Sequence, residues 1–260
     1  MNDSVKLSKD SLFHGELICY QNTSGYRFSI DSVLLAHFIL HWQDDVVLDM
    51  GCGCGIVGMI LLYRNAHIAQ TVEGLEYQQS LVRIARKNSQ ENGMSSRLTI
   101  THGDAAHIHR YYHAESFTKV MCNPPFYPTG SGRVSKNQEK YVARHQVALN
   151  TGDLAGSISY VLANKGRFAL VFAAELLGEL IKCLHRYGLQ PKRVRPVLSY
   201  PDASAASLVL VEGIKNGGRG MVLEKPLYVY DQKKGQYSRE LKEMYTPNPT
   251  APNMSARTLC

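Results

Sequence analysis

Short apolar runs alternate with longer amphipathic stretches along the chain from about residue 46 onward. The runs have the length of β-strands, and the stretches repeat their apolar residues at helical spacing. Strands that alternate with helices are typical of a mainly parallel sheet with helices on both faces. The pattern therefore predicts an α/β fold built on one such sheet.

The expected strands are seven segments, at residues 46–50, 71–76, 98–101, 118–122, 166–172, 194–198 and 207–211. The expected helices lie between them, at residues 58–63, 77–92, 153–163 and 174–187. Asp153 is the expected N-cap of the third helix, because aspartate accepts hydrogen bonds from free backbone amides. Gly188 is expected to end the fourth helix.

The two ends of the chain follow other patterns. Residues 16–20 and 26–29 flank a polar turn and predict a hairpin. Asp31 is the expected cap of an apolar helix over residues 32–40. Residues 246–260 hold three prolines and few apolar residues, which predicts a disordered tail. We therefore expect an N-terminal extension (1–40), a main domain (41–245) and the tail (246–260).

Composition places the chain in an ordinary class of protein. Its 260 residues are 44% hydrophobic and 20% charged, which suits one large globular domain. No apolar run approaches the roughly 18 residues of a membrane span. The first residues lack the apolar core of a secretory signal, so we expect a cytoplasmic protein. Lys and Arg outnumber Asp and Glu by 29 to 22, which modestly favours a polyanionic partner.

Two of the six cysteines stand in the segment Gly51-Cys-Gly-Cys-Gly55, which raises the question of a metal. A zinc site needs further ligands at short spacing, and the chain has no second cysteine pair of that kind. We therefore expect no metal. The alternative is that Cys52 and Cys54 are small residues that fill tight space.

Two cofactor classes fit the glycine-rich turn after the first expected strand. Residues 53–58 match the dinucleotide fingerprint, and Glu76 follows about twenty residues on. The register that begins at Asp49 also reads Asp-x-Gly-x-Gly-x-Gly, which suits S-adenosylmethionine. A sulfonium cofactor has no pyrophosphate, so it does not require a helix N-terminus aimed at phosphate.

In the second register, three carboxylates would surround the cofactor at the carboxyl edge of the sheet. Asp49 would reach the methionine ammonium, Glu76 the two ribose hydroxyls, and Asp104 the adenine amino group. Glu73 is a rival to Glu76 if the second strand ends earlier, and Asp49 and Glu76 alternatively only cap the helices that follow them. The glycines that would let the main chain approach the cofactor are Gly51, Gly53 and Gly55.

The segment Asn123-Pro-Pro-Phe126 favours the second register over a dehydrogenase, in which it would have no task. This tetrad resembles the catalytic motif of methyltransferases that modify planar amino groups, which implies an exocyclic NH2 group of a base as the target. Such a group donates its lone pair into the ring and is a poor nucleophile. The Asn123 side-chain oxygen and the Pro124 carbonyl would each accept one of its hydrogens, while Pro124 and Pro125 hold that carbonyl in place. Phe126 would stack on the target base. The alternative is a plain Pro-Pro turn that ends a strand.

Together these motifs resemble the class I S-adenosylmethionine-dependent methyltransferases, whose fold is a Rossmann-like, mostly parallel seven-stranded sheet. More narrowly, the chain resembles the bacterial tRNA adenine-N6 methyltransferases that act beside the anticodon of valine tRNA. That resemblance implies methyl transfer to an adenine N6 amine in tRNA. It also implies that Asp31, Ala105 and Asn123 contact the cofactor. The similar blocks are residues 31–36, the Asp49 glycine turn, 75–76, 123–126, 143–145, 166–168, 186–189, 226–231 and 237–240.

Other enzymes share the Asn-Pro-Pro-aromatic motif, so alternatives stay open. One kind methylates a glutamine amide of peptide-release factors and usually carries an N-terminal helical domain. Another methylates a guanine amino group of ribosomal RNA and often carries a second domain. The length of this chain favours the tRNA substrate. A catalytically silent RNA-binding module is a further alternative, against which the intact Asp49, Asn123 and Phe126 argue.

Two basic segments are candidates for contacts with RNA phosphates. The first follows the Asn-Pro-Pro-Phe segment directly, and its Arg144 and His145 would hold a phosphate or the flipped nucleotide. The second runs from residue 182 to 195 and equally suits a solvated face. The members of the first segment are Arg133, Lys136, Lys140, Arg144 and His145, and those of the second are Lys182, Arg186, Lys192, Arg193 and Arg195.

Overall fold

A computed structural model describes residues 6–23, 27–39, 45–68, 70–124 and 150–247. All seven expected strands are present, and most extend a few residues beyond their predicted ends. Two strands of two residues each, β10 (Val222–Leu223) and β11 (Leu227–Tyr228), pair with one edge strand and complete a nine-stranded sheet within these residues. The seven are β3 (Val46–Met50), β4 (Thr71–Glu76), β5 (Leu98–His102), β6 (Phe117–Cys122), β7 (Leu162–Ala173), β8 (Leu189–Leu198) and β9 (Leu208–Lys215).

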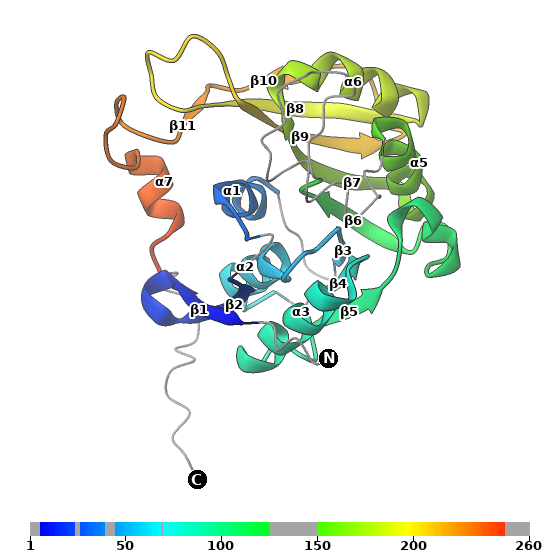
Figure 1. Cartoon of the computed structure of the whole chain (residues 1–260). Coiled ribbons are helices and arrows are strands. Elements are labelled where there is room, and N and C mark those ends of the chain that lie inside the picture. The colour runs from blue at the N-terminus through cyan, green and yellow to red at the C-terminus, as the bar shows by residue number, and fades with distance from the viewer. Residues whose placement is uncertain (1–5, 24–26, 40–44, 69, 125–149, 248–260) are drawn as a thin grey trace.

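The order of the strands distinguishes this sheet from a dinucleotide-binding sheet. Across the sheet the order is β10-β8-β9-β7-β6-β3-β4-β5 (Figure 1). Strands β3 to β7 are parallel, whereas β9 runs antiparallel to both β7 and β8. A dinucleotide-binding sheet is open and mostly parallel with the order 3-2-1-4-5-6. Here an antiparallel strand is inserted between the fifth and sixth strands. The predicted mostly parallel, Rossmann-like fold is confirmed, and the two short strands β10 and β11 add to the seven strands expected.

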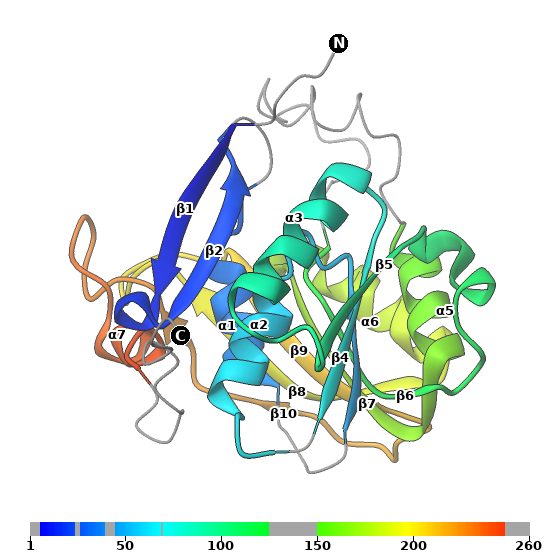
Figure 2. The same cartoon turned by 90° about the horizontal axis from the view of Figure 1, so that it is seen from below.

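Helices cover the two faces of the sheet as two separate groups (Figures 1 and 2). On one face, the apolar side chains of α1, α2 and α3 form one core cluster with the sheet. On the other face, η2, α5 and α6 form a second cluster. The helices are α1 (Ile30–Phe38), α2 (Ile56–Arg64), α3 (Gln79–Glu91), α5 (Thr151–Val161), α6 (Leu177–Arg186) and α7 (Arg239–Met244), with 3-10 turns η1 (Phe13–Gly15), η2 (Ala105–Arg110) and η3 (Ala174–Leu176).

Both predicted aspartate caps are wrong, because a polar residue two or three positions earlier takes the cap position. Ser29 is the N-cap residue of α1, and Asp31 accepts a hydrogen bond of 2.8 Å from its hydroxyl. Asn150 caps α5, where its Oδ1 accepts from the Asp153 amide at 2.8 Å. Each aspartate thus lies in the first turn, where its charge suits the positive end of the helix dipole.

The N-terminal hairpin forms with a different partner from the one expected. Strand β2 (Leu17–Asn22) pairs antiparallel with β1 (Leu7–Leu12), which precedes it. The described part of the expected second arm, residues 27–29, is not a strand, although the Arg27 side chain donates to Asp10 of β1 at 2.9 Å. The sequence of β1 is apolar only at its two ends, so its alternation is too weak to recognise.

Two asparagines of α3 bind β2 through its backbone. Asn88 accepts from the Tyr20 amide at 2.7 Å and donates to the Tyr20 carbonyl at 3.0 Å. One turn later, Asn92 makes the same pair of bonds to Ile18, at 2.9 and 2.7 Å. Asn88 also donates to the carbonyl of Cys54 in the glycine turn at 2.9 Å. Residues four apart on the helix therefore match residues two apart on the strand, and the hairpin lies along α3 (Figure 2). The bond from Asn88 to Cys54 ties the glycine turn to the same helix.

Replacing Asn88 by alanine is expected to lower the free energy of unfolding by about 2–4 kcal/mol, because three buried or half-buried backbone groups lose a partner. Urea unfolding of both proteins measures the difference. Gln90 is exposed on the same helix, so the control Gln90→Ala should change the free energy by less than about 0.5 kcal/mol. Equal effects of the two substitutions would contradict this role of Asn88.

The hairpin and the main sheet share one core. Leu17 and Cys19 of β2 are fully buried in the same cluster as Val47 of β3 and the apolar side chains of α2. The domain boundary expected at residue 40 stays a prediction. Residues 248–260 of the expected tail lie outside the described residues. In the described parts of the chain, no helix is both long and apolar enough to cross a membrane.

Candidate active site

The predicted site residues meet where the carboxyl ends of β3, β4, β5 and β6 adjoin. Asp49 near the end of β3 lies opposite Gly74 of β4 on one side and Met121 of β6 on the other. Glu76 ends β4 opposite His102 of β5. The chain moves from β3 outward to β5 and then returns to place β6 on the other side of β3. In open α/β sheets, ligands bind at this reversal of strand order.

The glycine turn has the backbone that its sequence requires. Gly51, Gly53 and Gly55 have φ angles of +75°, +58° and +82°, which side chains of L-residues rarely adopt. The Gly51 and Cys52 amides both donate to the Leu75 carbonyl, at 2.8 and 3.1 Å, and so bind the turn to β4. A Cβ at Gly51 would meet no atom within 4 Å. The turn therefore presents bare backbone beside open space, as a bound cofactor would need.

The two cysteines of the turn fill tight space, which was the alternative interpretation to a metal site. Cys52 and Cys54 are 4% and 3% exposed. A Cβ at Gly74 would lie 2.8 Å from the Cys52 sulfur, and the Cys54 sulfur lies 3.7 Å from that of Cys19. Burial raises the pKa of the Cys52 thiol well above its ordinary value. Over the described residues, the structure holds no group of three His, Cys, Asp or Glu side chains arranged for a metal.

Asp49 and Glu76 are both buried beside the turn, at 1% and 7% exposure. One oxygen of Glu76 accepts from the Gly53 amide at 2.9 Å, and the other accepts from the Gln78 amide at 2.8 Å. Asp49 accepts from the Gly58 amide of α2 at 3.3 Å. The bonds to the Gln78 and Gly58 amides lie at the starts of the following helices, as expected if the two carboxylates cap them. The Gly53 bond also fixes Glu76 against the glycine turn.

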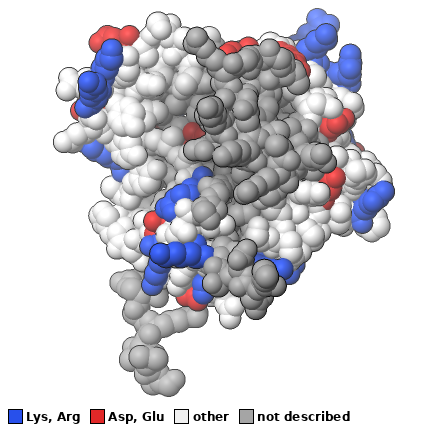
Figure 3. Space-filling view, viewed as in Figure 1, with Lys and Arg blue, Asp and Glu red and all other residues white. Residues whose placement is uncertain are grey.

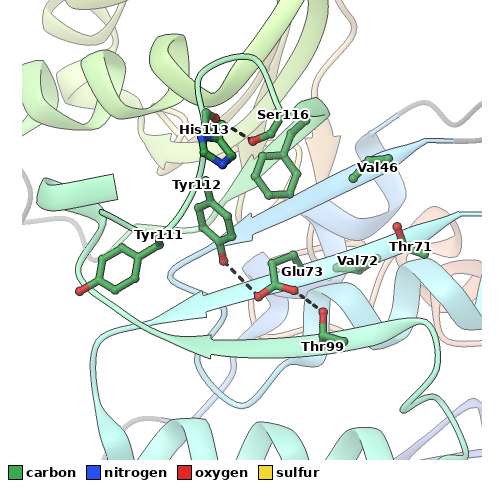
Figure 4. A pocket seen from close by; sticks show the side chains of 10 residues that line it. Val46, Thr71, Val72, Glu73, Thr99, Tyr111, Tyr112, His113 and Ser116 are labelled. Atoms are coloured by element: carbon green, nitrogen blue, oxygen red, sulfur yellow. Dashed lines mark hydrogen bonds between the residues drawn. The ribbon is translucent and has the colours of Figure 1, made fainter. Parts of the chain in front are cut away.

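Glu73, the rival of Glu76, is occupied elsewhere (Figure 4). Its carboxylate accepts hydrogen bonds from the hydroxyls of Thr99, Thr101 and Tyr112. It lines a cavity of about 290 Å³ between the strands and the segment after η2. Residues 73 and 76 are an odd number of positions apart along a strand, so their side chains leave opposite faces. Of the two glutamates, Glu76 is the one beside the glycine turn.

Asp104 and Ala105 follow β5 and begin η2. Asp104 is the N-cap residue of η2, and one carboxylate oxygen accepts from the Ala106 amide at 2.9 Å. The other oxygen lies 2.9 Å from Nδ1 of His107. Ala105 is buried, and its carbonyl accepts from the Ser157 hydroxyl at 2.8 Å. A ligand amine at Asp104 would use the second lone pair that each carboxylate oxygen retains.

Asn123 follows β6 directly and is half-buried. Its Nδ2 donates to the Ser32 hydroxyl of α1 at 3.3 Å, so its Oδ1 is the atom left to accept from a ligand. Asp31 precedes Ser32, and burial raises the pKa of its carboxyl, against which the Ser29 hydrogen bond acts. Ser32 was not among the predicted site residues, although a hydroxyl residue inside the similar block 31–36 was a signal for it.

Comparison with known proteins assigns the family. The sequence model of the methyltransferase small domain matches residues 24–176. The chain belongs to this family. The methyltransferase is 26% identical over 216 residues to a tRNA1(Val) (adenine(37)-N6)-methyltransferase of Photobacterium profundum, covering 83% of this chain and 88% of that one. A protein of the same name from Shewanella frigidimarina is 24% identical over 234 residues, with 86% and 92% covered.

Solved structures agree with the fold of the methyltransferase. A crystal structure of a predicted O-methyltransferase, Atu636 of Agrobacterium tumefaciens, superposes with a TM-score of 0.67 at 18% identity, covering 84% of this chain and 96% of that one. A geranyl diphosphate methyltransferase in complex with SAM gives a TM-score of 0.52 at 12% identity, covering 71% and 84%. The match to the methyltransferase family model, together with the antiparallel β9, sets aside the dinucleotide alternative for the glycine turn.

Several predicted residues of the methyltransferase fall outside the described residues. Pro124 is buried directly after Asn123. The rest of the Asn-Pro-Pro-Phe segment and the first basic segment are not described, so their roles stay predictions. These residues are Pro125, Phe126, Arg133, Lys136, Lys140, Arg144 and His145.

The second basic segment largely supports the fold of the methyltransferase. Arg193 forms ion pairs with the buried Glu212 and with Glu224, the latter at 2.6 Å. Arg195 holds both carboxylate oxygens of Glu240 at 2.7 Å and so connects β8 to α7. Among the described residues, Lys and Arg side chains are spread around the face of the molecule that Figure 3 shows. The segment therefore offers RNA fewer free cations than its sequence indicates.

Cofactor affinity of the methyltransferase is expected to fall below about pH 7. Burial, with a smaller contribution from the charge of Glu76, raises the pKa of Asp49 from 3.8 to about 7. A cationic ammonium favours the ionised carboxylate, so at lower pH binding must first displace a proton, and the Kd rises up to about tenfold per pH unit. In the protein without cofactor, folding favours the neutral form of the Asp49 carboxyl. The contribution of this carboxyl to the free energy of unfolding is therefore full below about pH 4 and is lost as the pH rises through 7.

Calorimetric titration with S-adenosylmethionine at pH 6 and pH 8, in two buffers of different ionisation enthalpy, measures the protons released. We expect a release of close to one proton at pH 6. At pH 8 we expect no net release, because the α-amino group of the cofactor, with an ordinary pKa of about 7.7–8.0, takes up protons on binding. Asp49→Asn, which cannot titrate, should bind weakly without this difference. A wild-type Kd that is equal at both pH values would contradict a direct role of the Asp49 carboxylate.

Proposed function

We propose that the protein transfers a methyl group from S-adenosylmethionine to the N6 amine of an adenine in tRNA. The relatives named as tRNA1(Val) (adenine(37)-N6)-methyltransferases support this proposal, since the matched regions span most of both chains. The favoured target is the corresponding adenine beside the anticodon of valine tRNA. A tRNA substrate in turn favours a cytoplasmic location.

Asn123 carries the proposal. It follows β6 beside the glycine turn, and Ser32 engages its Nδ2, which leaves Oδ1 to accept a hydrogen of the target amine. The Pro124 carbonyl accepts the other hydrogen, so the lone pair turns away from the ring and toward the incoming methyl group. Phe126 stacks on the base. The product ammonium is acidic and releases its proton to water, so no strong base is needed.

The cofactor, when bound, supplies an electrophilic methyl group on its sulfonium centre. The residues described above fit it: open backbone at Gly51 admits its methionine and ribose, and two buried carboxylates stand ready for its polar groups. Asp49 orients the ammonium, and Glu76, fixed by the Gly53 amide, accepts from the ribose hydroxyls. Asp104 accepts from the adenine amine, and Asp31 and Ala105 complete the proposed cofactor site.

RNA is the proposed macromolecular partner. The first basic segment, which follows the Asn-Pro-Pro-Phe segment in the sequence, contacts phosphates, and Arg144 and His145 hold the flipped nucleotide. The target base must leave its stack to reach Asn123, at a cost of about a few kcal/mol. A loop base beside the anticodon is easier to extrude than a paired base, which agrees with the favoured position.

Transfer of tritiated methyl groups to three purified substrates tests the proposal. We expect radioactivity in total tRNA and only background in ribosomal RNA and in a peptide-release factor. Label in ribosomal RNA or in the release factor instead would assign the enzyme to one of the alternative substrates. Cofactor binding without transfer to any substrate would indicate a silent module and contradict the proposal.

A further inference from the structure

A small hairpin near the C-terminal end of the described chain belongs to the similar blocks 226–231 and 237–240 but has no part in the site above. Tyr230 and Tyr237 pair in an antiparallel bridge. The Asp231 amide donates to the Gln236 carbonyl at 2.9 Å and closes the turn. Lys233 and Lys234 form its exposed tip, α7 follows directly, and Tyr245 comes next after α7. The motif thus places aromatic and basic side chains together.

Three tyrosine rings of this region form a ladder, which we call the tyrosine stack: Tyr230, Tyr237 and Tyr245. The rings of Tyr230 and Tyr237 have centroids 5.6 Å apart at an angle of 33°, and those of Tyr237 and Tyr245 are 5.9 Å apart at 15°. Tyr230 is 37% exposed and Tyr237 is 40% exposed, while Tyr245 packs against the core. The stack therefore begins in the interior and ends with rings that are open to a ligand.

The inner end of the stack lies close to the active site. Helix α7 contacts α1 (Figure 1). The negative charge of Asp31 in the first turn of α1 contributes to raising the pKa of Tyr245 to about 12, after burial and the neighbouring Tyr237. The next residue, Ser32, accepts the hydrogen bond from Asn123. A path of neighbouring residues thus runs from Asn123 across the start of α1 to the tyrosine stack.

The charge around the stack suits a polyanion. Between residues 225 and 245 the chain has five cations and three acids. One of the acids, Glu240, is neutralised by Arg195 of β8. Lys233 and Lys234 at the hairpin tip are exposed, and no ion pair of theirs is seen with a described residue. An exposed aromatic ladder edged by unneutralised lysines is the surface that binds unpaired nucleotides, through base stacking and phosphate contacts.

The support of the stack is rigid. Arg195 holds Glu240 of α7 through two bonds of 2.7 Å, and the Ser238 hydroxyl caps α7 by accepting from the Leu241 amide at 3.2 Å. Lys242 donates to Gln236 of the hairpin at 3.0 Å. Hairpin and helix are therefore fixed to the sheet edge and to each other, so the rings are ordered before a ligand arrives.

We propose that the tyrosine stack, with Lys233 and Lys234, binds the unpaired loop nucleotides of the RNA substrate that flank the target adenine. This inference rests on the proposed function and extends it, because it names a second RNA-binding surface besides the first basic segment. The bases next to the target stack on Tyr237 and Tyr230, and their phosphates meet the lysines at the tip. The surface thus guides the loop toward Asn123 without taking part in the chemistry.

Steady-state kinetics with tRNA tests the stacking part. Tyr237→Ala is expected to raise the KM for tRNA by roughly 5- to 150-fold, the range that corresponds to loss of one base stack, while kcat and cofactor affinity stay near wild type. Tyr237→Phe keeps the ring and should restore the KM. Tyr160 on α5 is exposed to a similar degree, 37% against 40%, so Tyr160→Ala is the matched control and should leave the KM unchanged.

The charge part is tested by the salt dependence of RNA binding. The double variant Lys233→Gln, Lys234→Asn should reduce the slope of log affinity against log salt by about two units. Asparagine is chosen because Lys234 has a φ of +60°, which asparagine tolerates. An unchanged slope would overturn the charge part, and this exposed tip offers little risk of misfolding.

The outcomes separate the inference from the function on which it rests. If wild-type protein methylates tRNA but the KM of Tyr237→Ala stays within twofold, the tyrosine stack is not an RNA surface and the proposed function stands. If Tyr160→Ala raises the KM as much, the effect is not specific and the inference is likewise overturned. If the wild-type protein neither binds nor methylates RNA, the proposed function fails and takes the inference with it.

Discussion

Replacing Asn123 by alanine is expected to lower kcat by roughly a hundred- to a thousand-fold, the loss typical of one preorganised polar contact in a transition state. The affinity for cofactor and for RNA should remain near wild type, because the contact of Oδ1 with the amine strengthens only as the nitrogen becomes tetrahedral. Single-turnover kinetics with tRNA measures the chemical step, and calorimetry measures cofactor binding.

Two further substitutions sharpen this test. Asn123→Asp retains an accepting oxygen, so its kcat should fall less than that of the alanine variant, unless the added charge disturbs the sulfonium. Ser32→Ala removes only the partner that orients the Asn123 amide at 3.3 Å, so it should cost less than Asn123→Ala. Wild-type turnover in Asn123→Ala would show that the Asn-Pro-Pro-Phe turn is only a strand terminator.

Replacing Glu76 by alanine is expected to weaken S-adenosylmethionine binding by about 1.5–3 kcal/mol, or roughly 10- to 150-fold in Kd. The carboxylate loses its bonds to the ribose hydroxyls, and the Gly53 amide loses the partner that fixes the turn at 2.9 Å. Glu76→Gln keeps one accepting oxygen and should lie between the two proteins. Calorimetric titration measures all three dissociation constants.

Glu73 provides the matched control on the same strand. Its carboxylate serves Thr99, Thr101 and Tyr112 on the opposite face, so Glu73→Gln should leave the Kd for the cofactor unchanged. A loss of affinity in Glu73→Gln with an unchanged Kd in Glu76→Ala would reverse the assignment. The two glutamates are only three residues apart on β4 but lie on opposite faces of the sheet. The comparison therefore tests directly which face of β4 binds the cofactor.

Local signals made much of the fold and of the candidate site predictable. Strands β3 and β4 have the bounds that their apolar runs indicated, because a glycine turn or a charged residue ends each run. The Asp49 and Glu76 positions followed from the same rule, since carboxyl ends of parallel strands meet at one edge of a sheet. Asn123 was recognisable because two prolines fix the end of its strand.

Features that depend on distant partners were not predictable. The position of β2 on α3 rests on Asn88 and Asn92, which bind β2 from a helix some seventy positions away. The partners of Glu73, three hydroxyls from two other segments, could likewise not be read from the sequence. The tyrosine stack likewise joins residues whose ring contacts arise only when the hairpin folds beside α7.

The most direct test of the central claim is mass spectrometry of nucleosides from valine tRNA after reaction with a donor that carries a deuterated methyl group. Two transcripts are compared, one with adenine beside the anticodon and one with guanine in its place. We predict deuterated N6-methyladenosine from the first transcript and no methylated nucleoside from the second. Label in any other nucleoside, or equal label in both transcripts, would contradict the account.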